Sequence, residues 1–473
     1  MVIKNVSYTL IALAFGITLN SCSEFQQEKP NLVFIFIDDL GWKDLGYMGS
    51  EFYETPHIDG LANKGMIFTN AYANAANCAP TRASLLSGQY SPRHGVYTVA
   101  RPDRGDAKDR RLIPIENSRK ISLDKITIAE ALKPAGYVSA AFGKWNVGNS
   151  PLVQGFDVAL DRYDLEGYNG GHFGENGEYL TDRLTSEAVE FIKMYQDQPF
   201  FLYLSHHAVH TPIQGQERLV SKYENKDADG CHQHSAYAAM VEGVDRSVGE
   251  ISSILENLGL SENTILIFFS DNGGHGTYTC QKPLRGGKGM FYEGGIRVPM
   301  FAYWPQHIES GSQNDEPVIG FDFYPTFLDL AGVEQPENYP LDGESILPLL
   351  KGNKALDRDE LYWHFPAYLQ SYEGMRSESR DTLFRSRPVS VIRDGDWKLL
   401  MYHEEWVLDG GREKLRTNNA VELYNLDNDL GENNNLANIE TSKREELLDK
   451  LLQWQEKINA PIPTVPNPEY QEK

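Results

Sequence analysis

The chain contains 473 residues, of which 41% are hydrophobic and 23% charged, and this balance is typical of a folded globular enzyme. Its formal net charge of −23 at pH 7 argues against nucleic acid or an anionic membrane surface as the main partner. The length corresponds to about three average domains, although large α/β domains often exceed the average. The sequence contains no internal repeat and no long low-complexity run.

The N-terminus is predicted to be a targeting segment rather than part of the fold. Lys4 is followed by an apolar stretch at positions 6–19, which is too short to span a membrane and is typical of a signal peptide. The stretch ends in LNSC at positions 19–22, which looks like a bacterial lipobox with an unusual asparagine. Residues 1–22 are therefore interpreted as a signal peptide with lipid attachment at Cys22, and ordinary signal cleavage nearby is the alternative.

Residues 23–30 form a polar tether. The mature protein is expected to be exported to the periplasm, or to be an outer-membrane lipoprotein, of a Gram-negative bacterium, in contact with the membrane only through a lipid on Cys22. Cys231 and Cys280 can pair in such an oxidising compartment. Two cysteines in a sequence do not by themselves establish a disulfide, because pairing depends on geometry.

The first strand of the folded part is predicted at positions 31–37, where NLVFIFI is a continuous apolar run of the kind buried on both faces. It ends in Asp38 and Asp39. Adjacent carboxylates at the end of a buried strand repel each other unless a cation compensates them. A hard divalent ion with oxygen ligands is the simplest solution, and a solvated turn is the alternative.

The sequence CAPTRASLLSG at positions 78–88 predicts a short helix with a thiol at its start. Pro80 suits the beginning of a helix and Gly88 suits the end. Cys78 then lies where free backbone N–H groups and the helix dipole favour an anion. Arg82 follows about one turn later, where its guanidinium can bind a tetrahedral oxyanion. An inert buried cysteine near a helix end is the alternative interpretation.

Further strands are predicted to end in polar residues. The strands are expected at residues 137–142, 199–204 and 264–269, and helices between them at residues 128–133, 184–195 and 236–258. The polar residues that follow the strands are Lys144 and Asn146, then His206, His207 and His210, then Asp271 and Asn272. This alternation favours an α/β fold with a mainly parallel sheet flanked by helices. Ligands bind beyond the carboxyl ends of such strands, where these side chains are expected to gather.

Lys288 lies in the glycine-rich sequence PLRGGKG at positions 283–289. Glycines allow the backbone to approach a ligand closely. A solvated lysine in a surface turn is the alternative.

The Cys-x-Pro-x-Arg motif and the ASLLSG that follows it resemble the signature of the sulfatase family, and the loop around Lys288 is similar to a loop of that family. The resemblance extends from about residue 31 to about residue 350. It implies an alkaline-phosphatase-like α/β fold and hydrolysis of sulfate esters, which we expect to be those of a sulfated carbohydrate. Residues 31–350 are expected to form the catalytic domain, and residues 351–473 a smaller C-terminal α+β subdomain.

The resemblance also implies roles for individual residues. It implies that a formylglycine-generating enzyme oxidises Cys78 to Cα-formylglycine, whose hydrate is the nucleophile, and that one Ca²⁺ is bound. The implied metal ligands are Asp38, Asp39, Cys78, Asp271 and Asn272. The implied catalytic residues are Cys78, Arg82, Lys144, Asn146, His210 and Lys288, with His210 as the general acid.

Asn146 departs from the family pattern, in which the loop usually reads Gly-Lys-Trp-His. The family histidine orients the formylglycine diol and takes its proton in the second step. An asparagine can form a hydrogen bond but cannot accept a proton at any accessible pH, so His206 or His207 is a possible substitute. Some sulfatases that act on glucosamine 6-sulfate also carry an asparagine here, and Asn146 is therefore not interpreted as a sign of inactivity.

The character of the sequence changes after residue 350. A hairpin is predicted at residues 387–401, a strand at residues 422–426 and a helix at residues 442–458. This subdomain is expected to close one side of the site, and the loop at residues 161–179 to contribute to the choice of glycan. Residues of the subdomain that can reach a sugar, but for which surface roles are expected, are Trp363, His364, Arg376, Arg385 and Arg387.

Two other functions are considered. A phosphodiesterase or phosphonate hydrolase of the same superfamily tends to use two zinc ions, whereas carboxylates with lysine and arginine suit one hard cation and a less charged sulfate ester. A non-catalytic protein that binds sulfated glycans could have lost turnover through Asn146, although Cys78 and Lys288 are intact. A sulfated ligand is anionic, so both a sulfatase and a protein that binds sulfated glycans require a basic pocket within this acidic protein.

Overall fold

The structure is a computed structural model, and it describes residues 29–372 and 378–472. The predicted signal peptide, including Cys22, and positions 23–28 of the tether lie outside the described residues, and so does Arg376. Among the helices that are described, none is both long enough and apolar enough to cross a membrane.

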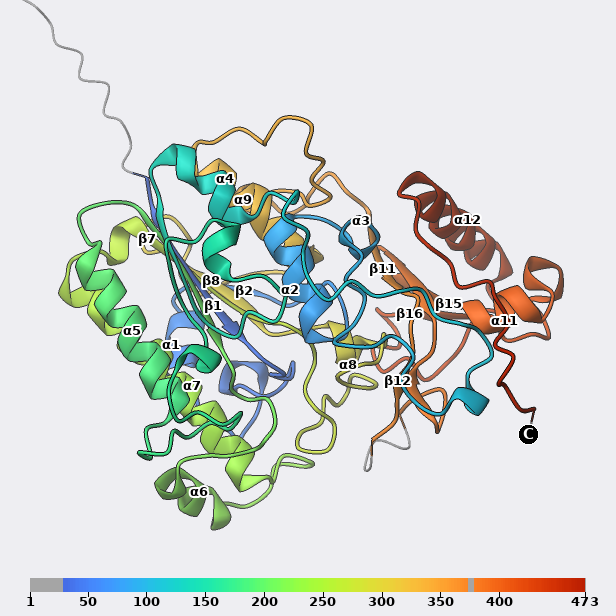
Figure 1. Ribbon diagram of the computed structural model, residues 1–473, viewed down its shortest axis with the longest axis horizontal. Helices are drawn as coiled ribbons and strands as arrows, with labels where there is room; N and C mark the ends of the chain where they lie inside the picture. The colour runs from blue at the N-terminus through green and yellow to red at the C-terminus, as the bar shows by residue number, and fades with distance from the viewer. Residues whose placement is uncertain (1–28, 373–377, 473) are drawn as a thin grey trace, which may run out of the picture.

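An eight-stranded sheet forms the centre of the molecule (Figure 1). Its strands, in spatial order, are β5 (Val158–Leu160), β4 (Val138–Gly143), β6 (Phe200–His206), β1 (Asn31–Ile37), β7 (Thr264–Ser270), β8 (Met300–Tyr303), β2 (Met66–Phe68) and β9 (Ser312–Asn314). Neighbouring strands run parallel except where β8 pairs with β7 and β2. The predicted mainly parallel sheet is confirmed.

Helices cover both faces of this sheet (Figure 1). One face carries α2 (Cys78–Ser87), α4 (Ile128–Leu132) and α9 (Phe323–Ala331), and the other carries α1 (Pro56–Ala62), α5 (Leu180–Met194) and α7 (Ser235–Asn257), with α6 (Glu217–Glu224) on α7. Shorter elements are α3 (Ser91–His94), α8 (Glu293–Ile296), α10 (Leu347–Leu350) and the pair of β3 (Ala71–Tyr72) with β10 (Val318–Ile319). Because successive side chains of a strand point to opposite faces, the apolar run of β1 supplies both hydrophobic cores.

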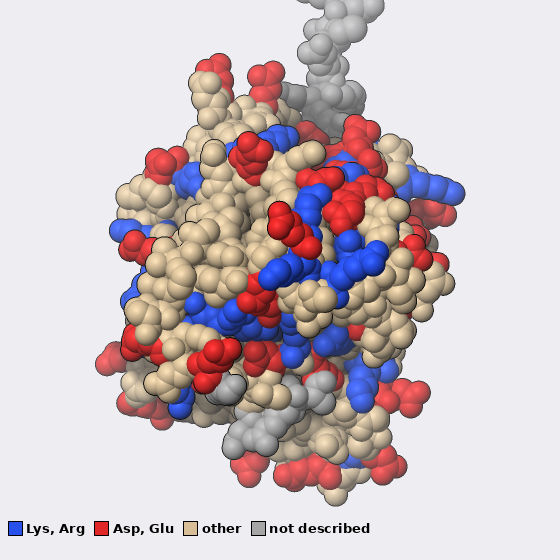
Figure 2. Space-filling model, turned by 90° about the vertical axis from the view of Figure 1, so that its right-hand side faces the viewer, with Lys and Arg blue, Asp and Glu red and all other residues tan. Residues whose placement is uncertain are grey.

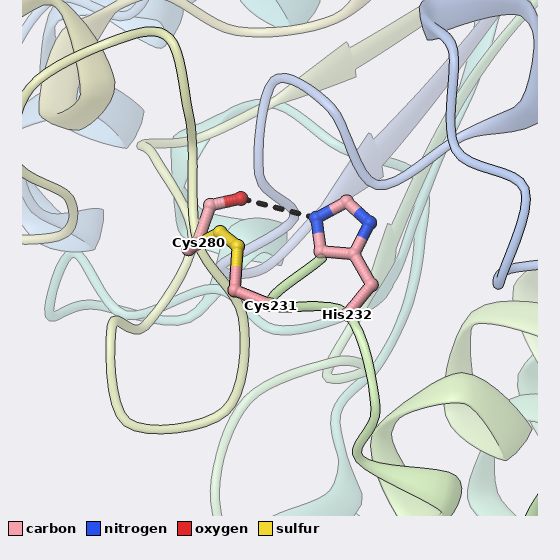
Figure 3. A group of neighbouring side chains, drawn as sticks. All are labelled: Cys231, His232 and Cys280. Atoms are coloured by element: carbon pink, nitrogen blue, oxygen red, sulfur yellow. Dashed lines mark hydrogen bonds between the residues drawn. A yellow bond between two sulfur atoms is a disulfide. The ribbon is translucent and has the colours of Figure 1, made fainter. Parts of the chain in front are cut away.

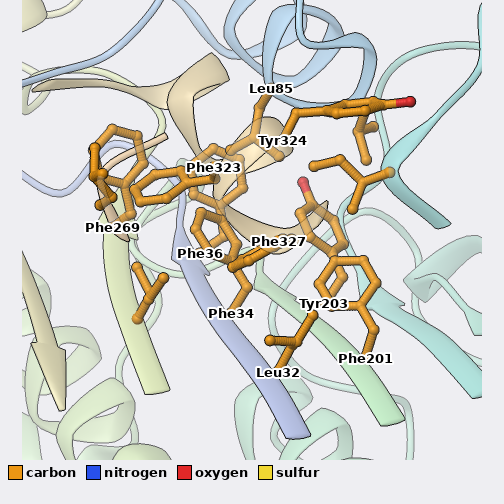
Figure 4. Close-up of a cluster of buried hydrophobic side chains, with 14 of the residues drawn as sticks. Leu32, Phe34, Phe36, Leu85, Phe201, Tyr203, Phe269, Phe323, Tyr324 and Phe327 are labelled. Carbon is orange, nitrogen blue, oxygen red and sulfur yellow. The ribbon is translucent and has the colours of Figure 1, made fainter. Parts of the chain in front are cut away.

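A cluster of aromatic side chains fixes α2 over the middle of the sheet (Figure 4). Phe34 of β1 packs edge-on against Phe323 of α9, with ring centroids 4.9 Å apart. Phe36 stacks with Phe269 of β7 at 6.0 Å, and Leu85 of α2 belongs to the same cluster. Such aromatic pairs contribute about 0.5–1.5 kcal/mol each beyond their burial. The packing therefore determines where the first residue of α2 lies relative to the end of β1.

A four-stranded antiparallel sheet forms the C-terminal subdomain (Figure 1, orange to red). Its strands are β11 (Glu360–Phe365), β14 (Val389–Asp394), β15 (Trp397–Tyr402) and β16 (Val421–Asn425), accompanied by β12 (Leu369–Gln370), β13 (Phe384–Ser386), α11 (His403–Leu408) and α12 (Thr441–Lys457). The predicted hairpin, strand and C-terminal helix are confirmed as β14–β15, β16 and α12. One face of the sheet packs on α12 and the other on the catalytic part of the chain.

A disulfide joins Cys231, just before α7, to Cys280 in the loop after β7 (Figure 3). The Cα atoms are 6.1 Å apart, and the ring of His232 donates a hydrogen bond to the Cys280 carbonyl at 3.1 Å. The pairing that the sequence left open is therefore present. It restrains the far end of a loop that begins with Asp271 and Asn272.

A buried ionic cluster connects the two parts of the chain. The ammonium group of Lys398, on β15, lies 2.9 Å from a carboxylate oxygen of Glu293, on α8, and 2.9 Å from one of Glu432. All three side chains are fully buried. Burial raises the pKa of Glu432, and the nearby Glu293 raises it further against the opposing effect of Lys398. One lysine thus holds two carboxylates at the interface between the subdomains.

Replacement of this lysine is expected to loosen the interface. In Lys398→Met, Glu432 loses its cation, while Glu293 keeps Arg297 at 3.5 Å, so we expect a loss of about 3–5 kcal/mol in the free energy of unfolding. The matched control is Lys193→Met, since Lys193 forms an exposed pair with Glu190 and should change stability by less than about 1 kcal/mol. Urea titrations followed by circular dichroism measure both variants, and equal unfolding midpoints would contradict the role given to Lys398.

Candidate active site

The carboxyl ends of β1 and β7 and the beginning of α2 meet at one edge of the central sheet. Asp38 and Asp39 directly follow β1, and Asp271 directly follows β7. The sulfur of Cys78 lies 3.3 Å from a carboxylate oxygen of Asp38 and 4.0 Å from one of Asp39. The polar side chains that the sequence predicted to gather at the strand ends are therefore in contact.

The helix that carries Cys78 begins at this residue, two positions before Pro80. A proline is tolerated there because the first four N–H groups of a helix have no partner within it. The helix ends at Ser87, and Gly88 follows in the left-handed conformation with φ 68°, as expected for a C-terminal glycine. Cys78 thus occupies the first helical position, with 1% of its surface exposed.

The thiol of Cys78 is not an anion in this environment. Burial raises its pKa, and the negative charge of Asp38 raises it further, against the opposing effects of Lys144 and Lys288. The helix N-terminus favours an anion by only about 0.3–1 kcal/mol, which is too little to offset burial beside a carboxylate. An unmodified Cys78 is therefore a protonated thiol and a weak nucleophile.

Three buried carboxylates and three cations form pairs around this thiol. The carboxylate of Asp271 accepts two hydrogen bonds from the guanidinium of Arg82, at 2.7 and 3.1 Å. Lys288 lies 2.6 Å from a carboxylate oxygen of Asp39. The third pair joins Lys144 to Asp38.

Arg82 holds the scaffold together rather than facing the cavity. It is fully buried, and it donates further hydrogen bonds to the carbonyl oxygen of Lys144 at 2.8 Å and to the hydroxyl of Ser205. Its guanidinium also lies 4.7 Å from the ring centroid of Phe36. Its donors are thus committed to protein groups, and it does not line the pocket described below.

The oxygen-rich group at this edge fits a hard divalent cation. The side-chain amide of Asn272 donates to Asp39 at 2.8 Å, while its carbonyl oxygen is buried without a partner in the described chain. Ligand atoms of Asp38, Asp39, Cys78 and His210 lie within 4.8 Å of one another. Carboxylate and amide oxygens are the ligands that hard cations prefer, so an ion here would satisfy the unpartnered oxygen of Asn272.

Both aspartates of this group are ionised. Burial by itself would raise the pKa of Asp38, but Lys144, His210 and other cations together hold it well below its usual range. Burial likewise opposes ionisation of Asp39, and Lys288 and His210 lower its pKa. The pair therefore presents two negative charges to a cation.

His210 lies beside this pair. Its Nε2 atom is 3.8 Å from Asp39, and its Nδ1 atom is 2.7 Å from the carbonyl oxygen of Thr211. The Nδ1–H group therefore donates to that carbonyl, an assignment that follows from the hydrogen-bond network. The side chain is 32% exposed, and it lines the pocket with its Nε2 atom available to a ligand.

The two other histidines after β6 do not replace the missing family histidine in the same way. The prediction that His206 can act as the substitute is wrong. Its ring is buried on the face of the sheet away from α2, where Nε2 lies 2.9 Å from the hydroxyl of Ser247 on α7. His207 is buried and lies 3.2 Å from Asp161, and neither histidine lines the pocket. Alternation along β6 explains the first error: Ser205 points toward α2, so His206 points away from it.

A pocket of about 240 Å³ opens beside Cys78 and is strongly basic. Its charged and polar side chains are Asn77, Cys78, Arg104, Lys144, Asn146, Arg162, Tyr163, His210, Lys288 and Arg385, and its apolar ones are Val99 and Leu369. No described carboxylate lines it. The local basic pocket that the sequence required within an acidic protein is therefore present.

Asn146 lines this pocket with a backbone φ of 56°. Asparagine tolerates this left-handed region better than most residues with a side chain. Its amide thus reaches the cavity from the loop that also carries Lys144.

Several residues of the C-terminal subdomain were named from the sequence as able to reach a sugar. Of those that the structure describes, Arg385 is the one that lines the pocket. The expected surface roles are wrong for Trp363 and His364, which are buried and bonded to the carbonyl oxygens of Ala73 and Pro461. Arg387 pairs with Glu404. Trp363 and His364 are buried because the antiparallel sheet packs on both of its faces, and Trp363 thereby bonds to the catalytic part of the chain.

Sequence reasoning did not identify Arg104, Arg162 or Tyr163 as pocket residues. Arg162 and Tyr163 belong to the loop at residues 161–179 that was expected to help select the glycan, so the segment was identified but its side chains were not. Arg104 lies in a charged surface-like stretch at residues 101–111. That stretch carries no local signal that would distinguish it from a solvated loop.

Comparison with known proteins is consistent with this geometry. The family model described as Sulfatase matches residues 30–333. A protein named Sulfatase from Formosa agariphila is 34% identical and aligns over 92% of this chain and 90% of its own length. The chain belongs to the sulfatase family.

Other relatives extend the sulfatase assignment to the C-terminal part. The N-acetylgalactosamine-6-sulfatase of Canis lupus familiaris is 33% identical over 71% of this chain and 69% of its own. The crystal structure of Ps i-CgsB in complex with k-i-k-neocarrahexaose has a TM-score of 0.72 and 29% identity, covering 94% of this chain and 96% of that one. A second family model, N-sulphoglucosamine sulphohydrolase, C-terminal, matches residues 286–459. This sulfatase is therefore a sulfuric ester hydrolase with the alkaline-phosphatase-like fold of its relatives.

Proposed function

We propose that this sulfatase removes sulfate esters from a carbohydrate, with Cα-formylglycine at position 78 and one Ca²⁺ held by Asp38, Asp39, Asp271 and Asn272. The observation that carries the proposal is the position of Cys78. It lies between the carboxylates of the cation site and the basic pocket, within 3.3 Å of Asp38. A nucleophile here can reach an anionic ester bound in the pocket.

The carbohydrate substrate is supported by the relatives and by the pocket. One relative is named N-acetylgalactosamine-6-sulfatase, and another was solved in complex with k-i-k-neocarrahexaose. Tyr163, 74% exposed at the pocket, offers an aromatic face of the kind on which sugar rings pack.

The residues of the active site have separate roles in the proposed reaction. As the formylglycine hydrate, position 78 supplies a hydroxyl nucleophile in place of the weak thiol. Lys144 and Lys288 reach the pocket and supply positive charge to the sulfate oxygens. Arg82 positions Asp271 and the Lys144 backbone. His210, in its protonated form, gives the proton on Nε2 to the leaving sugar oxygen, which is otherwise a poor leaving group, and keeps the proton on Nδ1 that the Thr211 carbonyl accepts.

The cation site fits calcium better than a pair of zinc ions. The four residues proposed as ligands offer carboxylate and amide oxygens, whereas zinc prefers nitrogen and sulfur. Cys78 and His210 also lie within reach of this group, but conversion of Cys78 removes its sulfur and His210 is assigned to the leaving group. When bound, calcium supplies positive charge that holds and polarises the sulfate group. This donor set favours sulfate ester hydrolysis over the phosphodiesterase or phosphonate hydrolase activity considered above.

Export is part of the proposal. The signal-peptide pattern of residues 1–22, with Cys22 as the lipid attachment site, is supported by the disulfide between Cys231 and Cys280, since structural disulfides are typical of oxidising compartments. The protein would reside in the periplasm or on the outer membrane of a Gram-negative bacterium. It would depend on a formylglycine-generating enzyme for conversion of Cys78.

Conversion of Cys78 is tested directly. We expect Cys78→Ala to keep the far-UV circular dichroism spectrum and to release no detectable sulfate, because the nucleophile is removed. The assay measures sulfate released from N-acetylgalactosamine 6-sulfate, glucosamine 6-sulfate and neocarrageenan oligosaccharides. Intact mass of active wild-type protein should show an aldehyde instead of the thiol. Release of sulfate by Cys78→Ala at the wild-type rate would contradict the mechanism. A wild-type protein that binds these saccharides tightly but releases no sulfate would favour the non-catalytic glycan-binding function.

Calcium binding is tested by thermal stability rather than by rate. After chelation, Ca²⁺ at 100 times its dissociation constant should stabilise the fold by about 2.7 kcal/mol, measured as a rise in melting temperature. Asp39→Ala should abolish the response, whereas Asp315→Ala, an exposed control, should keep it. Two zinc ions per chain by elemental analysis would point to the phosphodiesterase class instead.

The role of Asn146 is decided by two variants. If its amide holds the diol or the sulfate by a hydrogen bond, Asn146→Ala should lower kcat/KM by about 10-fold, the order expected for one hydrogen bond to a charged group, and Asn146→His should not raise it. Both rates are measured on the best substrate, with equal conversion of Cys78. An inert wild type and an active histidine variant would show that the native site lacks its base.

A further inference from the structure

The active-site pocket holds more positive charge than one sulfate ester requires. Lys144 and Lys288 lie at the carboxylates of the cation site. Arg104, Arg162 and Arg385 also line the cavity and come from three distant segments of the chain. A sulfate monoester carries a single negative charge, and Lys144 and Lys288 already face the pocket next to Cys78.

These three guanidiniums have no acidic partner among the described residues. Arg104 donates to the carbonyl oxygen of Val99, and Arg385 donates to the carbonyl oxygens of Gln370, at 2.9 Å, and Lys288, at 3.2 Å. Carbonyl groups accept hydrogen bonds but do not neutralise a full positive charge. The pocket arginines therefore keep their charge available to a ligand.

Several arginines outside the pocket do have acidic partners. Figure 2 shows Lys and Arg across the middle of one face of the molecule, with Asp and Glu around them. Among the described pairs, Arg111 lies 2.7 Å from Asp409 and Arg412 lies 2.5 Å from Asp449. The three pocket arginines differ from these in having no carboxylate partner.

Arg104 and Arg385 line the same cavity, and both are held in place. The backbone N–H of Tyr368 donates to the carbonyl oxygen of Pro102 at 2.8 Å, which fixes the segment before Arg104. The guanidinium of Arg385 lies 3.9 Å from the ring centroid of Tyr372. Burial lowers the pKa of Arg104, and the like charge of Arg385 lowers it further. Two guanidiniums without a carboxylate partner are thus fixed in one pocket.

Arg162 and Tyr163 also line the pocket. The guanidinium of Arg162 donates to the hydroxyl of Tyr163 at 3.0 Å and lies 4.9 Å from the centroid of its ring. Tyr163 is itself exposed at the pocket. The pocket therefore combines its cations with an exposed aromatic ring.

We propose that Arg104 and Arg385 form a second anion subsite, so that the preferred substrate carries another negative group besides the sulfate ester that is cleaved. This inference rests on the proposed function of the same pocket. The second group is a tetrahedral sulfate or a planar uronate carboxylate, because a guanidinium binds either through paired N–H donors. A second anion would supply the carboxylate or sulfate partner that neither guanidinium has, so the pocket selects the more charged ligand.

Matched saccharides that differ by one charge test this subsite. The sulfate arm compares N-acetylgalactosamine 6-sulfate with its 4,6-disulfate, and N-acetylglucosamine 6-sulfate with glucosamine 2-N,6-O-disulfate. The carboxylate arm compares a uronate-linked N-acetylgalactosamine 6-sulfate disaccharide with the same molecule reduced to the alcohol. We expect wild type to prefer the more charged member of at least one pair by about 10- to 100-fold in kcat/KM, the order expected for hydrogen bonds to a charged group.

The arginine variants show whether the subsite causes that preference. Arg104→Gln and Arg385→Gln should each reduce the ratio of the two kcat/KM values at least about 5-fold. Arg416→Gln, a change at an exposed residue outside the pocket, should keep the wild-type ratio. Equal losses on both members of the pair would mean that the arginines bind the reacting sulfate, and would overturn the proposal.

A binding measurement separates this inference from the proposed activity. The same saccharides are titrated calorimetrically into Cys78→Ala, which cannot turn them over, with and without Arg104→Gln. Tighter binding of the more charged member, lost in the double variant, supports the subsite even when wild type cleaves none of the sugars and the proposed activity fails. Equal affinities within all three pairs, together with equal rates, would overturn it.

Discussion

The ion pair between Arg82 and Asp271 is the interaction on which the active site depends. Arg82 belongs to α2 and Asp271 to the end of β7, and the same guanidinium also bonds to the Lys144 carbonyl and to Ser205 on β6. One side chain thus joins the helix of the nucleophile to three strands of the sheet. Removing one partner of a buried pair typically costs about 3–5 kcal/mol, so the position of Cys78 is coupled to the stability of this edge.

Charge balance explains why a dense ionic centre is tolerated inside the fold. Asp38, Asp39 and Asp271 each lie beside a cation, so none of these three carboxylates is buried alone. The unpartnered oxygen of Asn272 is the exception among these groups, and it marks the place where a cation would be accommodated. The same pairing brings Lys144 and Lys288 to the pocket, so the residues that neutralise the carboxylates also face the substrate.

The charges of the substrate pocket, in contrast, are not balanced by carboxylates. Arg104, Arg162 and Arg385 remain without carboxylate partners in a protein that otherwise carries an excess of acidic residues. Charge without compensation lowers stability, and proteins commonly keep such costs where a ligand is bound. The C-terminal subdomain contributes directly to the pocket. Strand β13 supplies Arg385, and the backbone hydrogen bond from Tyr368 to Pro102 holds the loop of Arg104.

The sequence by itself determined the chemistry at the strand ends. Apolar runs such as positions 31–37 specify buried strands, and the carboxylates, amides and cations that follow them need only the rule that parallel strands end at one edge. The motif at 78–88 identified Cys78 and its helix for the same reason: the signal is local. The roles of Lys144, Asn146, His210 and Lys288 came from resemblance, and the structure shows only that all four reach one pocket.

Only the tertiary structure decided which side chains share a space. Strand alternation turned Ser205 toward Arg82 and His206 away from it, and packing of the antiparallel sheet buried Trp363 and His364. It also brought together Arg104, Arg162 and Arg385 from segments far apart in the chain. No local pattern encodes such meetings, because a solvated arginine and a pocket arginine look alike until long-range packing removes their acidic neighbours.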